Sequence, residues 1–114
     1  MKPVVALRAF FLAVLAVMLF VTIRASLDYP ISEVSPRIGF DWWFRATLTD
    51  AYCGFLTFYA WVFYLERGVA RRVLWLVLIL LGGNIAMAVY ALIRLFRLSA
   101  DAGARDILLR REDA

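Results

Sequence analysis

The sequence contains no histidine and only one cysteine, Cys53. The lack of histidine removes the commonest side-chain metal ligand and proton carrier near neutral pH, so it excludes histidine ligation of haem or chlorophyll. One cysteine cannot form a disulfide within the chain, and it does not indicate a redox compartment. The sequence also has no Ser/His/Asp set, no metal-binding cluster and no glycine-rich phosphate loop. We therefore expect no enzyme activity, no metal site and no cofactor.

Charge is sparse as well: 19% of the 114 residues are charged, whereas 65% are hydrophobic. Soluble domains contain roughly 45–50% apolar residues, and a domain this small leaves much of its surface in water. The excess apolar surface must then meet lipid. The 16% of aromatic residues suits a chain that crosses membrane–water interfaces. We expect an integral, multi-pass membrane protein whose partner is the lipid bilayer.

Three apolar segments are each close to the ~20 residues that a helix needs to cross a bilayer. A spanning segment must satisfy its own backbone hydrogen bonds, which favours helix. The sequence therefore predicts one all-α domain over residues 1–114, a bundle of three transmembrane helices with a short C-terminal surface segment. The expected helices are 4–24, 46–65 and 73–96, the extramembrane loop is 25–45, and the tail is 97–114.

The first apolar segment has a second interpretation as a signal peptide, because Lys2 and Arg8 precede an apolar run. Its apolar stretch is long, however, and Arg24 lies close to the best cleavage position, after Ser26. We favour a retained helix.

The net charge is +4, and the basic residues are scattered at segment ends. Nucleic-acid binding needs a basic patch or stripe, so we expect no nucleic-acid partner. Anchoring to anionic lipid headgroups fits better. For orientation, the short "RGVARR" loop indicates a cytoplasmic side, whereas "RLFRL" after the third helix indicates the reverse. We favour a cytoplasmic N-terminus in a bacterial inner membrane.

A polar and small stripe follows one face of the second helix, at 3-4-3-4 spacing. In lipid such a face is expected to turn towards protein. The first and third helices carry small-residue faces that would allow close packing. The stripe on the second helix contains Thr47, Asp50, Gly54, Thr57 and Trp61; the small faces contain Ala6, Ala9, Ala13 and Ala16 on the first helix and Gly82 and Ala86 on the third.

Depth in the bilayer predicts contacts between the helices. Asp50 lies about 6 Å inside the second helix, at 1.5 Å per residue, and the third helix would end on that side with Arg94. Asp50 then pairs with Arg94 as a structural link, which we favour. The alternatives are that it serves as a proton or cation site or that it is simply exposed to solvent. The same reasoning pairs Arg8 with Glu66 and Thr57 with Asn84.

Two stretches, "WWFRATLTDAY" and "LLGGNIAMAVYALIRLFRL", carry a family resemblance. Over about residues 40–98 the chain resembles an uncharacterised family of small multi-helix integral membrane proteins, a domain of unknown function found in bacteria and plants. The resemblance implies a membrane protein of unknown activity and carries over no catalytic residue, cofactor or substrate. It does place Thr47, Asp50 and Glu66 within the family pattern.

The function we expect is that of a structural or accessory component of a membrane assembly, in contact with itself or with a larger membrane complex. The main alternative is a small oligomeric transporter, coupled to protons or cations through Asp50. A membrane enzyme acting on lipid would need a polar constellation at one interface. Asp28, Glu33 and Asp41 are too loosely placed to form one.

Overall fold

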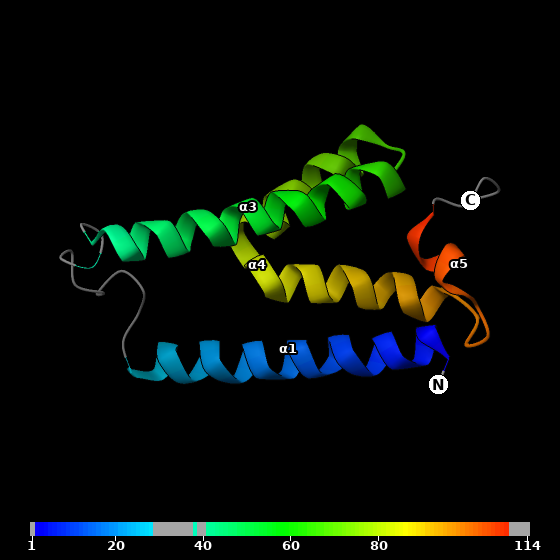
Figure 1. Ribbon diagram of the computed structural model, residues 1–114, viewed down its shortest axis with the longest axis horizontal. Helices are drawn as coiled ribbons and strands as arrows, with labels where there is room; N and C mark the ends of the chain where they lie inside the picture. Colours follow the sequence, from blue (N-terminus) through cyan, green and yellow to red (C-terminus); the bar gives the residue numbers. More distant parts are fainter. Residues whose placement is uncertain (1, 29–37, 39–40, 110–114) are drawn as a thin grey trace.

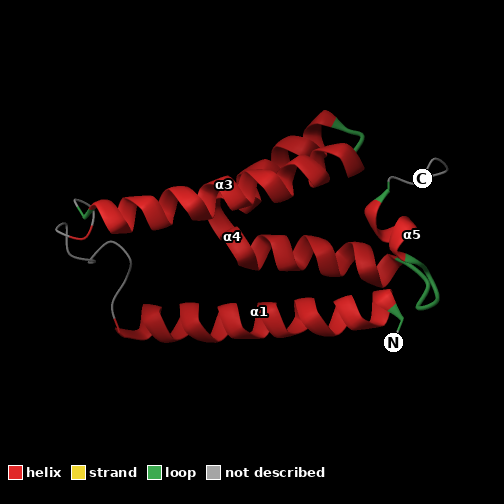
Figure 2. Ribbon diagram, in the orientation of Figure 1, coloured by secondary structure: helices red, strands yellow, loops and turns green. Residues whose placement is uncertain are grey.

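The computed structural model describes residues 2–28, 38 and 41–109, and within these residues the fold is all-helical, as predicted (Figures 1 and 2). Parts of the expected loop and tail lie outside the described residues. Three long helices are followed by one short helix. They are α1 (Pro3–Asp28), α3 (Trp42–Leu65), α4 (Val69–Arg97) and α5 (Ala104–Leu108).

All three long helices extend beyond the ranges that the apolar pattern predicts, and two of them extend into the expected loop. Helix α1 continues past residue 24 to Asp28, where Arg24 pairs with Asp28 one turn later at 2.6 Å. Helix α3 begins at Trp42, because the Asp41 side chain accepts a hydrogen bond from the Trp43 N–H at 2.8 Å. An aspartate in this capping position satisfies a backbone donor that the helix itself leaves unpaired. The expected loop 25–45 therefore contributes residues to both helices.

Helix α4 is interrupted at Gly83, where φ is +54° and ψ is −129°. The two arms on either side fold back on each other. Trp75 and Tyr90 would lie about 22 Å apart along a straight helix, yet their ring centroids are 4.8 Å apart. In Figure 1 the first arm runs beside α3, and the second arm returns between α3 and α1. The expected third helix, 73–96, is thus a helical hairpin and not a single straight rod.

The reversal of α4 makes it the central element of the bundle, in contact with both α1 and α3. Two apolar clusters result. The cluster between α1, α4 and α5 contains buried Val4, Leu95, Leu98 and Ile107. The cluster between α3 and the two arms of α4 contains buried Val62, Leu65, Ile79 and Tyr90.

The face by which α1 contacts α4 is not the alanine face that the sequence suggested. Ala9, Ala13 and Ala16 are exposed. The side of α1 that begins with Val4 packs inward instead, with Leu7 and Phe11 against the first cluster. The contact between α1 and α4 is therefore made by larger side chains of α1, and not by a close approach of the two helix backbones at alanine.

Among the residues that the structure describes, two helices and not three are long and apolar enough to span a membrane: α1 and α4. Helix α3 is not among them. The apolar stretch of α4 is divided at Gly83 into arms of about 14 residues, or about 21 Å each. Each arm is shorter than the ~30 Å hydrocarbon core of a bilayer. The sequence-based bundle of three straight spans is therefore corrected in the number of spans and in the shape of the third helix.

Replacing Gly83 with alanine tests the reversal. A positive φ is unfavourable for residues other than glycine, and a Cβ at this position would lie 2.9 Å from the Phe55 ring. We expect the Gly83→Ala variant to lose about 1–3 kcal/mol in the free energy of unfolding, measured by thermal or denaturant unfolding in detergent. Gly54→Ala is the matched control, because a Cβ there meets nothing within 4 Å. It is expected to be neutral or stabilising in α3, so equal losses in both variants would contradict the hairpin.

Candidate functional site

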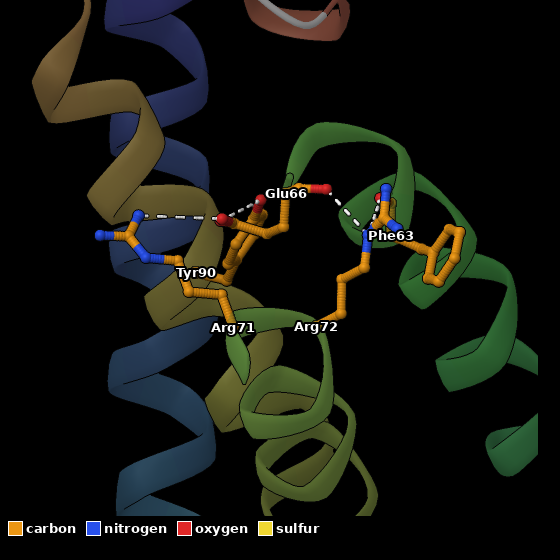
Figure 3. Close-up of polar contacts among 5 residues, drawn as sticks. All are labelled: Phe63, Glu66, Arg71, Arg72 and Tyr90. Atoms are coloured by element: carbon orange, nitrogen blue, oxygen red, sulfur yellow. Dashed lines mark hydrogen bonds and ion pairs between the residues drawn. The ribbon is translucent and has the colours of Figure 1, made fainter. Parts of the chain in front are cut away.

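The end of α3 and the two arms of α4 meet at a polar contact centred on Glu66 (Figure 3). Glu66 follows the last residue of α3, and its backbone N–H donates to the Val62 carbonyl. Its carboxylate accepts a hydrogen bond from the Tyr90 hydroxyl at 3.1 Å. The other carboxylate oxygen lies 3.9 Å from the Arg71 guanidinium. Glu66 therefore joins the first arm of α4 to the second.

Tyr90 is the most connected aromatic residue of this region and is only 5% exposed. Its ring makes edge-to-face contacts with Phe58 and Trp61 of α3 and with Trp75 of the first arm, at centroid distances of 6.2, 6.0 and 4.8 Å. Such contacts each contribute about 0.5–1.5 kcal/mol beyond the burial of area. One side chain thus holds three helical segments together while its hydroxyl points to Glu66.

Arg72, near the start of α4, holds the connection between α3 and α4 by hydrogen bonds to the end of α3. Its Nε donates to the carbonyls of Phe63 and Glu66, at 3.0 and 2.9 Å, and the guanidinium lies 3.8 Å from the centroid of the Phe63 ring. The Arg72 carbonyl in turn accepts a hydrogen bond from the Tyr59 hydroxyl at 2.7 Å. Carbonyls at a helix C-terminus have no partner within the helix, and here an arginine supplies one.

Two more arginines occupy helix C-termini in the same way. Arg8 donates to the carbonyls of Leu95 and Leu98 at the end of α4, at 3.0 and 2.8 Å. Arg94 donates to three carbonyls of the short final helix and the residue after it, at 2.7–3.1 Å; these are Asp106, Ile107 and Leu109.

These contacts determine where the sequence-predicted partners lie. The pairing of Asp50 with Arg94 assumed that α4 ends beside the start of α3. Because α4 reverses at Gly83, its C-terminus returns to the other end, and Arg94 lies over the Trp61 ring at 6.0 Å. Arg8 reaches the end of α4, while Glu66 is engaged by Tyr90 and Arg71.

A cleft of about 320 Å³ opens between the two arms of α4, next to Glu66. Three of its lining side chains are arginines and one is a glutamate, so positive charge dominates. Its remaining wall is mostly apolar. The lining residues are Glu66, Arg71, Leu74, Trp75, Tyr90, Ile93, Arg94, Arg97 and Leu98.

A second, open pocket of about 620 Å³ lies beside the reversal of α4. It brings together Asp50, Thr57 and Asn84, three of the residues that the sequence singled out, and all three are exposed. The Thr57 hydroxyl donates to the Cys53 carbonyl within α3 at 2.8 Å, and Thr47 does the same to Trp43 at 2.9 Å. The threonine hydroxyls are thus bonded to their own helix.

In the part of the chain that the structure describes, no group of three or more His, Cys, Asp or Glu side chains could hold a metal ion. The polar side chains of the two pockets can form hydrogen bonds and bind anions or small cations, and the second pocket also contains the Cys53 thiol. Sequence reasoning missed Tyr90, Arg71 and Trp75 as site residues. Their spacing along α4 brings them together only if the helix folds back, and the Gly82–Gly83 pair was the available signal for such a break.

The comparison with protein families gives one match, to "Protein of unknown function (DUF1475)", over residues 2–113. The match extends beyond the resemblance over residues 40–98 and includes α1. No curated protein and no solved structure matches the chain.

Removing the Tyr90 hydroxyl tests the central contact. Tyr90→Phe keeps the aromatic packing but removes the donor to Glu66, so we expect a loss of about 1 kcal/mol in the free energy of unfolding. Tyr52→Phe is the matched control, because its hydroxyl makes a longer bond, 3.3 Å, to the Leu80 carbonyl at an exposed position. Unfolding in detergent should show a clearly larger effect for Tyr90→Phe. Equal effects would mean that the Glu66 contact contributes no stability.

Proposed function

The chain belongs to the DUF1475 family of proteins of unknown function, and from its geometry we propose that it is a membrane-embedded accessory component of a larger assembly. The observation that carries this proposal is the apolar outer surface of α1. The helix turns one side towards α4 and leaves large apolar side chains exposed, among them Phe10, Val17 and Phe20 at 57%, 60% and 71%. A contiguous apolar surface of this kind marks contact with lipid or with another protein.

In the proposed arrangement α1 and α3 cross the bilayer, and α4 enters from one side and returns to it. Helix α3, with 24 residues, would be about 36 Å long, which is enough to cross the core despite its lower hydropathy. The arms of α4 are individually too short to cross. A reversal of the backbone within the bilayer is tolerated where protein or a water-filled cavity surrounds it, and the pocket beside Asn84 supplies such a place.

The charge distribution supports this arrangement. The start of α1, the α3–α4 connection and the end of α4 lie at one end of the bundle (Figure 1). An exposed ion pair between Lys2 and Asp101 also links the start of α1 to the segment after α4. The described basic residues at this end are Lys2, Arg8, Arg67, Arg71, Arg72, Arg94, Arg97 and Arg105. Positive charge near helix ends favours the cytoplasmic side, so we place the basic end, with the N-terminus, in the cytoplasm of a bacterial cell.

The small size of the bundle favours a role through its outer surface. The described residues bury only a few side chains completely, and their two clusters serve to hold the helices together. The exposed sides of α1 and α3 remain available to a second copy of the chain or to another membrane protein. We propose a role in assembly and no enzymatic role.

Tags at the two ends of the full chain test the proposal. We expect both tags to be protected from an external protease in intact spheroplasts, because α1, α3 and the α4 hairpin return the chain to the cytoplasm. Mild-detergent purification through either tag is expected to retain a stoichiometric membrane partner or a second copy of the chain. Digestion of the C-terminal tag alone would show that α4 crosses the bilayer as one helix. A chain that purifies as a monomer with no partner would overturn the accessory role.

A transporter is the second candidate function, and one observation favours it: Asp50, Thr57 and Asn84 line one pocket beside the broken helix. Interrupted helices near the bilayer midplane are typical of ion and substrate sites in transporters. Asp50 would then carry a proton or hold a small cation.

Asp50→Asn separates the two functions in proteoliposomes with a pH-sensitive dye inside. Under the accessory proposal the wild-type chain passes no protons above the level of empty liposomes, and the substitution changes nothing. Asp101→Asn is the matched control, because it removes a carboxylate at the other end of the bundle. A wild-type proton flux that is lost in Asp50→Asn and kept in Asp101→Asn would replace the accessory role with transport.

A further inference from the structure

We propose that the cleft between the arms of α4 binds the phosphate group of an anionic phospholipid, with an acyl chain of that lipid along its apolar wall. This inference rests on the proposed function, since it needs the basic end of the bundle to lie at a membrane surface. The cleft has a volume of about 320 Å³, within the range of small-ligand pockets.

The charges around the cleft favour an anion. Among the described residues that line the cleft, three are arginines and one is a carboxylate, Glu66, which already accepts a hydrogen bond from Tyr90. A phosphate would therefore meet a net positive site, where it competes with Glu66 for Arg71. Guanidinium groups suit this role because their planar donors match phosphate oxygens.

The three arginine side chains of the cleft differ in how firmly their contacts hold them. Arg94 is held by the three carbonyls at the end of α5, so its charge is fixed at the rim of the cleft. Arg97 is exposed, and in the described part of the chain it has no ion-pair partner. Arg71 is 68% exposed and lies at the long distance of 3.9 Å from Glu66. Arg97 can thus turn towards an incoming phosphate, and Arg71 can do so by exchanging its long contact with Glu66 for one with the phosphate.

The apolar lining of the cleft explains why a lipid fits better than free phosphate. Leu74, Trp75, Ile93 and Leu98 line it, and Leu74 and Ile93 are themselves 53% and 41% exposed. Apolar side chains that continue to the outer surface would add nothing to the binding of a small, fully hydrated anion. They would favour an acyl chain that enters from the bilayer, with the headgroup at the basic end.

Lipid binding by the full-length protein in detergent tests the proposal, with bound lipid counted by native mass spectrometry. We expect phosphatidylglycerol to bind more tightly than phosphatidylcholine, and inorganic phosphate at the same concentration not to displace it. Arg97→Gln is expected to weaken phosphatidylglycerol binding about fivefold, the equivalent of about 1 kcal/mol for one basic residue near a membrane surface. Arg105→Gln is the matched control, since it removes the same charge at the same end of the bundle but outside the cleft.

A second variant separates the contribution of the apolar lining to lipid binding from that of the arginine charges. Ile93→Trp fills the apolar wall and leaves all three arginines in place, so it is expected to reduce phosphatidylglycerol binding while thermal unfolding confirms the fold. Equal losses in Arg97→Gln and Arg105→Gln would show a diffuse surface attraction and overturn the site. Displacement by inorganic phosphate would show a soluble-anion site. If the tags report the expected topology but the lipid binds no better than phosphatidylcholine, only this inference fails and the accessory role stands.

Discussion

The conformation of one residue, Gly83, determines how the rest of the bundle is arranged. It is the only residue with positive φ in the described chain, 2–28, 38 and 41–109, and the Phe55 ring occupies the space that a Cβ would need. The reversal there places Tyr90 against Trp75 and brings the Glu66 carboxylate to the Tyr90 hydroxyl. Without it the second cluster would lose the side chains that join α3 to both arms.

The reversal also brings the C-terminus of α4 to the end of the bundle where α3 and α5 end (Figure 1). Each C-terminus leaves carbonyls that need donors, and burying them without partners is costly. The chain uses arginine for this purpose: Arg72 at the end of α3, Arg8 at the end of α4 and Arg94 at the end of α5. All three side chains donate to backbone carbonyls at these helix ends. Charged donors form stronger hydrogen bonds than neutral ones, so this end of the bundle is well connected.

Hydropathy and segment length predicted the all-helical fold and the approximate positions of the long helices, because both depend on composition over about 20 residues. They could not predict the break in α4, since a single dihedral angle leaves no trace in a hydropathy average. The error then propagated: depth along a straight helix assigned Arg94 to Asp50, whereas the reversal carries it to Trp61. The structure places Asp50, Thr57 and Asn84 around one pocket near the reversal, a grouping that the sequence analysis did not predict.

The two ends of the α4 hairpin differ in how well their polar groups are satisfied, and this difference bears on function. At the basic end, Glu66 and the helix C-termini have partners that the structure shows. At the reversal, Asp50, Thr57 and Asn84 face an open pocket and are all exposed. An exposed carboxylate is stable in water and costly in lipid. If α4 enters a bilayer, the reversal therefore needs either water or the polar side chains of another molecule beside it.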